Sequence, residues 1–410
     1  MGDIVGVYDG VHQTPKYQKS GIMFLSVENI AILKSSKYIS EDDFKRYYKV
    51  YPQKNDILMT RIGDVGTTNI VTDNDLKAYY VSLALLKYRN TNPYFLSNAI
   101  QSDYVKKGLA NRTLKTAIPM KINKDEIGKV DVMLPLSSDE QSKIGVYFRN
   151  LDHLITLHQR KLDLLKQLKK AYLQVMFPAK DEKIPKVRFA NFEGDWEERK
   201  LEKIAPLRGG FAFKSLEFQN SGIPIVRISN ILSNGKIGGE FEYYVEQDKD
   251  ENYLLPDKAV VLAMSGATTG KVAILSNDKN KKIYQNQRVG YFQPIKGIDY
   301  RIVSTVVSSN IFLSQLKSVL VSGAQPNVSV KEINAFKFLL PKSFEEQTKI
   351  SQLFIALNTN IFLQQSKVEH LQKLKTIYLQ QCQSKMKMSQ NVGHYKCNDF
   401  QKNHCTYRAK

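Results

Sequence analysis

The sequence contains very little cysteine and tryptophan. Three of its 410 residues are Cys and one is Trp, and the cysteines, Cys382, Cys397 and Cys405, all lie close to the end of the sequence. No disulfide framework can therefore support the body of the chain, and hydrophobic burial must stabilise its domains. With 42% hydrophobic residues, the chain has enough apolar sequence for two or three domains, each with its own core.

Long apolar runs are also missing. No stretch approaches the roughly 18 to 20 apolar residues that a membrane-spanning helix needs. The opening sequence MGDIVGVYDG contains Asp3, which does not suit a signal peptide. We therefore expect a cytoplasmic protein that does not cross a membrane.

Acidic residues are outnumbered by basic ones. The 60 Lys and Arg residues exceed the 40 Asp and Glu residues, which gives a formal net charge of +20. This surplus favours a polyanion as partner, with nucleic acid first and an acidic membrane surface second.

An internal repeat organises the chain. At a constant offset of 206, without a gap, 19 of the 45 residue pairs between 130–174 and 336–380 are identical. A weaker match lies upstream, where GIMFLSVENI (21–30) resembles GIPIVRISNI (222–231). Duplication of one structural unit explains both matches.

A glycine-rich segment, AMSGATTGKV at 263–272, raises the question of a nucleotide site. A P-loop needs four residues between its glycines and a Ser or Thr after its lysine, but here three residues separate the glycines and a valine follows. The matching segment of the first half, within 56–71, keeps both glycines but has Thr67 in place of Lys271. We therefore predict a turn between two strands, whose polar tip can reach a ligand.

Short runs of Val, Ile, Leu, Tyr and Phe, separated by Gly, Asn, Asp and Pro, predict strands in both halves. Examples are DILMT, YYVSLALLKY, IPIVRISNI and FKFLLP. A shorter helix is expected in each half, such as PYFLSNAIQSDYVKKGL in the first. The pattern predicts an α+β fold of two similar units, each made of about 130 strand-rich residues followed by one long helix.

Each long helix carries an apolar stripe. Apolar residues alternate spacings of four and three over about 37 residues, or about 55 Å, with a polar step at His158 or Gln364. The expected partner of each helix is the other one; the alternative is a helix packed on its own domain. The predicted seam residues are Ile144, Phe148, Leu151, Ile155, Leu162, Leu165 and Tyr172 in the first helix, and Ile350, Phe354, Leu357, Ile361, Val368, Leu371 and Tyr378 in the second.

The sequence resembles the specificity subunits of type I DNA restriction–modification systems. The resemblance runs from about Gly2 to Gln383 and rests on the doubled helix openings LP…EQ.KI…F…L and on F…W.ERKLEKIA, which precedes the second unit. Two features depart from the family pattern. The first unit has no counterpart of KVRFANFEGDWEERKLEKIA, and the basic ending after Gln383 is unlike the usual short one.

The resemblance implies a function and partners. In the family, each strand-rich unit is a target-recognition domain that reads one half of a split DNA sequence, and the two long helices form an antiparallel coiled coil that separates the two domains. The subunit has no catalytic residues of its own. It binds double-stranded DNA and two modification (methyltransferase) subunits and, for cleavage, two restriction subunits. S-adenosylmethionine, ATP and magnesium are expected on the partners and no cofactor on this chain.

The expected domain bounds follow the repeat. They are a first target-recognition domain at 1–138, a first long helix at 139–177, a linker at 178–200, a second target-recognition domain at 201–344, a second long helix at 345–383 and an atypical basic tail at 384–410. The first domain is short at its N-terminal side, and its fold is expected to be less complete.

Base reading needs Arg for guanine, Asn or Gln for adenine, and Ser or Thr for either. Polar loop residues that touch only phosphate or water are the alternative at each position. The candidates in the first unit are His12, Gln13, Thr14, Lys16, Tyr17, Arg61, Thr67, Thr68, Asn69, Arg112, Thr113 and Lys115. Those in the second unit are Lys214, Arg227, Asn230, Ser265, Thr268, Thr269, Lys271, Gln285, Asn286, Gln287, Arg288, Gln325 and Asn327.

Catalytic and metal motifs are incomplete. NPYF at 92–95 lacks the second proline of the adenine-methyltransferase motif, and no glycine-rich cofactor loop accompanies it. Pro256-Asp257 is not followed by the acidic-x-Lys step of common nucleases. His and Cys residues between His394 and Cys405 match no standard zinc spacing, so we expect no metal site. The remaining alternative function is a coiled-coil scaffold that binds polyanions without sequence preference.

The charge surplus generates a prediction. The chain, alone or with its modification subunit, should bind duplex DNA with an affinity that falls steeply as salt rises, because bound Lys and Arg release counterions from the phosphates. Fluorescence anisotropy with labelled duplex at several salt concentrations measures this slope. An affinity that stays the same between low and moderate salt contradicts the polyanion interpretation.

Overall fold

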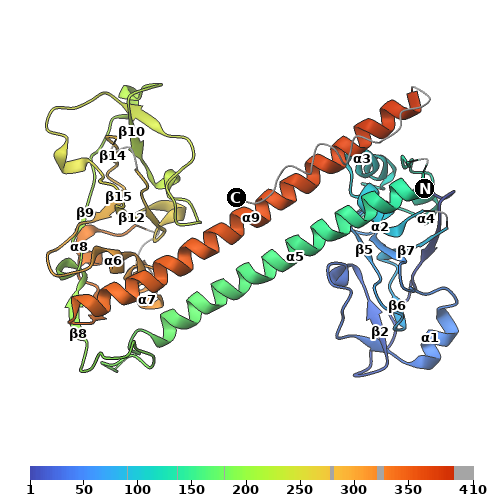
Figure 1. Cartoon of the computed structure of the whole chain (residues 1–410), viewed down its shortest axis with the longest axis horizontal. Helices are drawn as coiled ribbons and strands as arrows, with labels where there is room; N and C mark the ends of the chain where they lie inside the picture. Colours follow the sequence, from blue (N-terminus) through green and yellow to red (C-terminus); the bar gives the residue numbers. More distant parts are fainter. Residues whose placement is uncertain (90, 136, 180, 278–280, 321–326, 392–410) are drawn as a thin grey trace. The chain divides into compact units, whose positions relative to one another are not determined.

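A computed structural model describes the chain apart from residues 90, 136, 180, 278–280, 321–326 and 392–410, and apart from the side chains of 387–391. The chain divides into two compact units (Figure 1). Unit 1 contains residues 1–158 together with the described residues from Lys367 onwards, and unit 2 contains Gln159–Ser366. Both units mix helices and strands, so the predicted α+β class with two similar domains is confirmed.

Unit 1 contains two small sheets. One has the strand order β1-β7-β4-β5 and is antiparallel throughout; the other has the order β3-β2-β6, in which β2 and β6 are parallel. Its elements are β1 (Val5–Asp9), β2 (Ile22–Leu25), η1 (Val27–Asn29), β3 (Tyr38–Ile39), α1 (Glu41–Tyr47), β4 (Ile57–Thr60), β5 (Thr68–Ile70), β6 (Lys77–Tyr79), β7 (Leu83–Tyr88), α2 (Pro93–Ile100), α3 (Asp103–Arg112) and α4 (Lys124–Gly128), followed by the start of α5 (Ser138–Val175) and the end of α9 (Phe344–Asn391).

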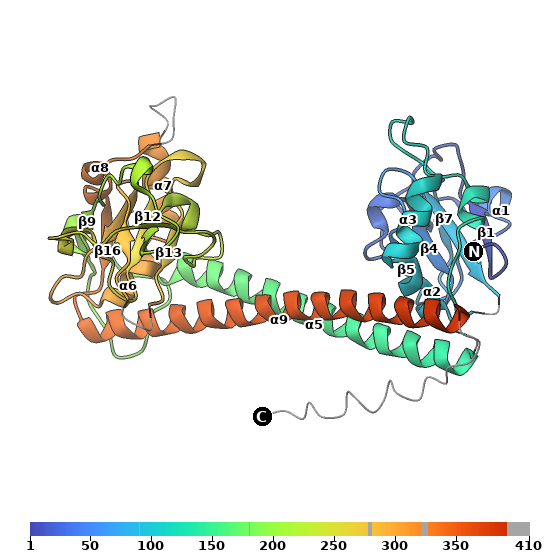
Figure 2. The ribbon, with the colours of Figure 1, turned by 90° about the horizontal axis from the view of Figure 1, so that it is seen from above.

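The larger sheet of unit 1 is buried on both faces. Side chains alternate along a strand, so β4 sends Ile57 and Met59 to one face and Leu58 to the other. The first face packs against α2, α3 and α4, and the second against the smaller sheet. Figure 2 shows α2 and α3 lying over strands β4, β5 and β7. This double coverage explains the continuous apolar run ILMT in β4.

Unit 2 repeats this plan. Its sheets have the orders β9-β15-β12-β13 and β11-β10-β14, and a third pairs β8 with β16. Its elements are β8 (Glu197–Lys200), η2 (Leu201–Lys203), β9 (Leu207–Arg208), η3 (Ser215–Glu217), β10 (Ile223–Val226), η4 (Ile228–Asn230), β11 (Glu242–Tyr244), η5 (Glu251–Tyr253), β12 (Val260–Ala263), η6 (Gly266–Thr268), β13 (Val272–Ile274), β14 (Tyr284–Gln285), β15 (Val289–Phe292), α6 (Tyr300–Val306), α7 (Asn310–Leu320), α8 (Val330–Asn334) and β16 (Lys337–Leu340), with the end of α5 and the start of α9.

The glycine-rich segment is a turn between two antiparallel strands in both units, as predicted. It joins β12 to β13 in unit 2 and β4 to β5 in unit 1. Gly266 (φ +72°) and Gly270 (φ +88°) adopt left-handed backbone conformations, as do Gly63 (φ +79°) and Gly66 (φ +100°). These conformations favour glycine, which is why both copies keep the pair.

The two long helices pack against each other inside unit 1. Phe148 of α5 lies in one buried cluster with Leu371 and Cys382 of α9. The Tyr147 and Tyr378 rings are 5.5 Å apart, and the Asp152 carboxylate accepts a 2.6 Å hydrogen bond from the Lys375 ammonium. Residue numbers rise along α5 as they fall along α9, so the helices are antiparallel there.

Unit 2 contains the other halves of both helices. Ile350, Phe354 and Leu357 of α9 are buried in its main core, with Leu165 and Tyr172 of α5 packed on the same cluster. The seam residues therefore contact both the other long helix and the domain core. The two interpretations weighed from the sequence are both correct in part. Among the other predicted seam residues, Leu162 and Val368 are buried, and Ile144, Ile155 and Ile361 are partly buried.

Helix bounds differ from the expected ones at three places. Helix α9 continues to Asn391 instead of ending near 383, because half of 384–391 is Met or Lys and the segment has no Gly or Pro. Helix α5 ends at Val175 instead of 177, because Pro178 follows closely and Met176 and Phe177 turn into the core. The single short helix expected at 93–109 is two helices, α2 and α3, separated at Gln101 and Ser102.

The buried phenylalanines give a stability prediction. Phe148→Ala and Phe354→Ala should each lower the free energy of unfolding by about 3 to 5 kcal/mol, because both side chains are 1% exposed in their cores. Leu164→Ala is the matched control, since Leu164 on α5 is 60% exposed and should change stability by less than about 0.5 kcal/mol. Urea denaturation measures all three. Equal losses for buried and exposed variants contradict the described packing.

Candidate nucleic-acid interface

Backbone hydrogen bonds bring separate loops of unit 2 to one end of its sheets. The Phe211 N–H donates to the Gln285 carbonyl, and the Gln287 N–H donates to the Phe211 carbonyl, both at 2.9 Å. The Met264 N–H donates to the Arg288 carbonyl at 2.9 Å. Ser265 forms an isolated bridge with Asn327. We call residues 211–217, 226–230, 264–271, 285–288 and 327–328 the loop edge of unit 2.

Unit 1 builds the same arrangement from different residues. The Val81 N–H donates to the Val11 carbonyl, and the Arg61 N–H donates to the Ser82 carbonyl, both at 3.0 Å. The Gly63 N–H donates to the Met120 carbonyl at 2.8 Å. We call residues 11–17, 26–29, 61–67, 80–82 and 113–121 the loop edge of unit 1. Most predicted site residues therefore lie together on one edge in each unit.

Several predicted site residues are exposed on these edges and available to a ligand. Basic and amide side chains predominate among them, together with one aromatic ring, Tyr17, which lies 5.5 Å from the Lys37 ammonium. Lys214 pairs with Glu217 at 3.0 Å, a surface contact that a phosphate can replace at little cost. The exposed candidates on the loop edges are His12, Gln13, Thr14, Lys16, Tyr17, Lys115, Lys214, Gln287, Arg288 and Asn327. Arg112 is also exposed, but it lies at the end of α3, outside the loop edge of unit 1, and pairs with Glu126 at 3.1 Å.

Three predicted residues of the first unit have structural roles instead. Arg61 is 5% exposed, and its guanidinium pairs with Asp9 and donates to the Ile122 carbonyl at 3.0 Å. Burial lowers the pKa of Arg61 from its ordinary value, because desolvation disfavours the charged form. The Thr68 hydroxyl contacts Ser97, and the Asn69 amide donates to the Ile30 carbonyl at 2.8 Å. These contacts hold the domain together and engage the polar groups of all three side chains inside it.

Two predicted residues of the second unit are also structural. Asn230 is 1% exposed; its amide oxygen accepts from the Arg227 N–H at 3.0 Å and its nitrogen donates to the Gly238 and Glu240 carbonyls. Gln285 is fully buried and donates to the Arg208 and Val289 carbonyls at 2.9 and 2.7 Å. Their hydrogen-bonding groups are used inside the domain, so we remove both from the base-reading candidates.

The remaining predicted residues are partly engaged. Arg227 pairs with Glu242 at 2.8 Å and lies over the Phe218 ring at 5.7 Å. The Thr67 hydroxyl donates to Asp64, and the Thr113 hydroxyl donates to the Leu109 carbonyl.

Residues of the glycine turn and its neighbours complete the second-unit set. The Thr269 hydroxyl donates to Gly266 and the Asn286 amide donates to Gln287. Ser265 is buried and Lys271 is half-buried, while the Thr268 hydroxyl is buried without a hydrogen-bond partner in the described part of the chain. Gln325 lies outside the described residues.

The geometry adds two residues that the sequence interpretation missed. In unit 1, Tyr80 forms an isolated bridge with Val11. The equivalent bridge in unit 2 joins Asn286 to Phe211. Lys121, which is exposed, bridges Ile62 as Asn327 bridges Ser265. The 206-residue offset that aligns the helices maps Tyr80 onto Asn286 and Lys121 onto Asn327, two predicted site residues. Applying this offset to the predicted residues of the second unit would therefore have found both.

No cluster of three His, Cys, Asp or Glu side chains suited to a metal occurs among the described residues, and His394 to Cys405 fall outside them. Within the described residues, every helix is too short or too polar to span a bilayer.

Comparison with known proteins defines the family. The family model for the type I restriction modification DNA specificity domain matches residues 3–167 and 193–373, most of both units. Each half of the chain, a mixed α/β unit with a long helix, therefore matches one copy of the specificity domain. The chain belongs to this family.

A curated relative is the type I restriction enzyme MjaVIII specificity subunit of Methanocaldococcus jannaschii, 26% identical over 278 residues. The match covers 65% of this chain and 64% of the relative's length. A solved type I S subunit from M. genitalium matches 92% of this chain and 93% of its own, with a TM-score of 0.66 and 14% identity, and supports the fold.

The contacts of Asn230 generate a prediction. Asn230→Ala should destabilise the loop edge of unit 2 by about 1 to 3 kcal/mol, because it leaves the Gly238 and Glu240 carbonyls without their donor. Gln287→Ala, at an exposed position of the same edge, should leave stability within about 0.5 kcal/mol. Amide hydrogen exchange across 227–240 measures the difference. Unchanged protection in the Asn230 variant would return that residue to the base-reading candidates.

Proposed function

We propose that the chain is the DNA-reading subunit of a type I restriction–modification complex and that each unit reads one half of a split target. The observation that carries the proposal is the loop edge, which both units build with the same backbone bonds but line with different side chains. Identical scaffolds with different surfaces suit two different half-sites. The chain's family and its net charge of +20 support DNA as the ligand.

The exposed side chains define how reading occurs. Gln287 and Asn327 carry the paired donor and acceptor that match adenine, and Arg288 carries the fork that matches guanine. Lys16, Lys115 and Lys214 supply charge for phosphates, which position the domain without reading sequence. In unit 1, Gln13 and Thr14 are the exposed groups that can pair with base edges.

Chemistry is assigned to partner subunits. Two modification subunits would methylate adenine using S-adenosylmethionine, and two restriction subunits would cleave using ATP and magnesium. This chain would choose the site for both and would act in the cytoplasm. Its relatives include a specificity subunit of a type I restriction enzyme, which supports this division of labour.

Half-site reading is tested by methylome sequencing in cells that express the chain with its modification subunit. Arg288→Ala should relax one position in one half-site, because a lost base-edge contact is worth about 1 to 3 kcal/mol. Gln13→Ala should affect only the other half-site. Lys296→Ala is the control, since Lys296 is exposed beyond the opposite end of β15 from Arg288 and should leave the motif unchanged.

Two outcomes count against the proposal. A change in both half-sites by either single variant, with the fold intact, means that the units do not read independently. Methylation that shows no sequence motif favours the scaffold alternative, in which the basic surface binds DNA without preference.

A further inference from the structure

Two aliphatic side chains on the loop edges are almost fully exposed. Ile118 in unit 1 is 100% exposed and Leu216 in unit 2 is 99% exposed. The next most exposed large apolar side chain in the described part of the chain, Ile32, is 69% exposed. Contact between a whole aliphatic side chain and water is unfavourable, and burying the side chain removes that cost. One such residue on the loop edge of each unit indicates a shared role in binding.

In unit 1, Ile118 belongs to a loop that follows α3, and Figure 2 shows this loop projecting beyond α3. Residues 118–120, which we call the apolar tip, are Ile, Pro and Met and are all exposed. Backbone hydrogen bonds fix the base of the loop. The Leu114 N–H donates to the Lys121 carbonyl at 2.8 Å, and the Gly63 N–H donates to a carbonyl of the tip, also at 2.8 Å. The apolar tip is therefore held outward by the glycine turn and the ends of its own loop.

The surroundings of the apolar tip are basic. Residues 111–123 contain one Arg and two Lys but no Asp or Glu. Lys115 and Lys121 stand on either side of the tip, and both are exposed. Cationic groups that flank an apolar tip suit a groove of DNA, because phosphates line its rim and the stacked bases inside it offer apolar faces.

In unit 2, Leu216 lies in η3, a turn that is anchored by its neighbours. Phe213 is 7% exposed and stacks on Tyr284 at a ring distance of 5.4 Å. The Tyr244 hydroxyl donates to the Glu217 carboxylate. These contacts face the domain, whereas the Leu216 side chain is directed to solvent. Unit 2 therefore also presents an aliphatic side chain from a fixed turn.

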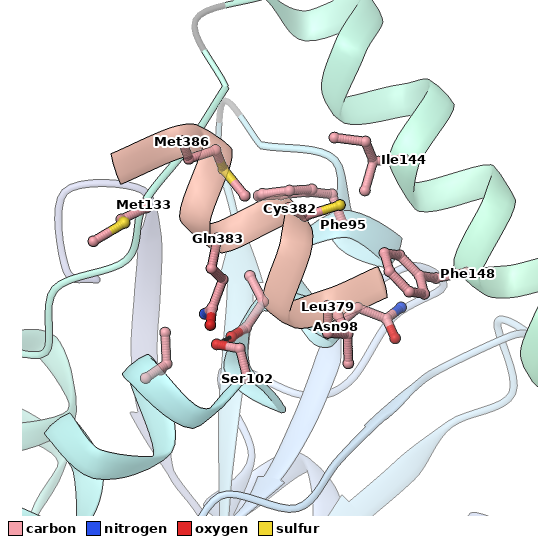
Figure 3. A pocket seen from close by; sticks show the side chains of 12 residues that line it. Phe95, Asn98, Ser102, Met133, Ile144, Phe148, Leu379, Cys382, Gln383 and Met386 are labelled. Carbon is pink, nitrogen blue, oxygen red and sulfur yellow. Dashed lines mark hydrogen bonds between the residues drawn. The ribbon is translucent and has the colours of Figure 1, made fainter. Parts of the chain in front are cut away.

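A second copy of the chain is the alternative occupant, and it would need a cavity that fits an aliphatic side chain. An apolar cavity in unit 1, lined by Phe95, Phe148, Cys382 and their neighbours, has a volume of about 20 Å³ (Figure 3). This volume suits roughly one water molecule. A wider hollow within 28–37 is lined by charged and polar residues. Neither suits an aliphatic side chain, whereas the place of both residues on the loop edges favours DNA.

We propose that Ile118 and Leu216 are wedges, and that each unit inserts its wedge between two adjacent base pairs of its half-site, where the DNA unstacks and bends. Ile, Leu, Met and Pro are residue types that DNA-bending proteins insert in this way. An aliphatic side chain cannot hydrogen-bond to a base edge. A wedge instead selects sequence through the cost of unstacking, which is lowest at flexible steps such as TA and CA. The inference rests on the proposed DNA-reading function and adds a contact that deforms the target.

The test measures binding of the full chain, in complex with its modification subunit, to duplexes that carry the target found by methylome sequencing. A nick at the inserted step leaves every base in place but lowers the cost of unstacking there. The parent complex should therefore bind that nicked duplex about tenfold more tightly than the intact one. Moving the nick one step at a time should locate two such positions, one in each half-site.

Ile118→Ser and Leu216→Ser should each bind the intact duplex about tenfold more weakly than the parent, because the wedge is lost. Each should lose the gain from the nick in one half-site only, and energy transfer between dyes at the duplex ends should show a smaller bend. Leu76→Ser and Leu313→Ser are the matched controls, since these residues are 43% and 40% exposed and lie outside the loop edges. Both controls should bind and bend DNA as the parent does.

Three outcomes overturn the wedge proposal. The first is equal binding and equal nick response in the wedge variants and the controls. The second is weaker binding by the wedge variants without any nick-sensitive step in the parent; if replacing thymine by uracil also weakens the parent, the contact is with thymine methyl groups. The third is loss of the modification subunit from either wedge variant, which indicates a protein-docking role.

The same measurements separate this proposal from the proposed function. Urea denaturation should give the parent's midpoint for all four variants, as expected at exposed positions, so that binding losses are not losses of fold. If the wedge proposal fails, the parent complex still prefers its target to an unrelated duplex. A parent complex that binds both duplexes equally contradicts DNA reading itself and the wedge proposal with it.

Discussion

Burial of one strand on both faces is the constraint on which each unit depends. Strand β4 in unit 1 and β12 in unit 2 pack against helices on one face and a smaller sheet on the other. A strand held in this way cannot shift by one residue without moving its apolar side chains to the wrong face. The glycine turn that follows each strand is fixed with it. The loop edge therefore has a rigid base, although its exposed side chains are free to differ.

The sequence predicted this framework well because the framework is repeated. The heptad seam, the glycine turn and the strand runs occur twice, and each copy supports the interpretation of the other. Residue-level assignments were less successful, because loop polarity does not show where a side chain points. Arg61, Asn230 and Gln285 have the residue types that read bases, yet their polar groups bond within the domain. Burial of a polar side chain depends on tertiary contacts that a loop sequence does not display.

The repeat also contained a way to recognise some of these errors. Asn230 has a counterpart, Asn29, whose amide oxygen accepts from the Ser26 N–H at 2.9 Å as Asn230 accepts from Arg227. Under the proposed function the two units read different half-sites, and they then have no reason to share a base-reading residue. A side chain identical in both copies is therefore evidence for architecture, and one that differs is evidence for recognition. Arg227 differs from its counterpart in the repeat, Ser26, and is therefore a candidate for recognition.

The division of the long helices affects how the protein forms during synthesis. Unit 1 contains residues 1–158 but also Leu371, Tyr378 and Cys382 of the last helix. A ribosome adds roughly 5 to 20 residues each second, so the first domain waits roughly 10 to 45 s between its own completion and the arrival of residue 386. During that interval Phe148 and Leu151 lack their partner helix. The nascent chain consequently exposes an apolar helix face of unit 1 until the last helix has been made.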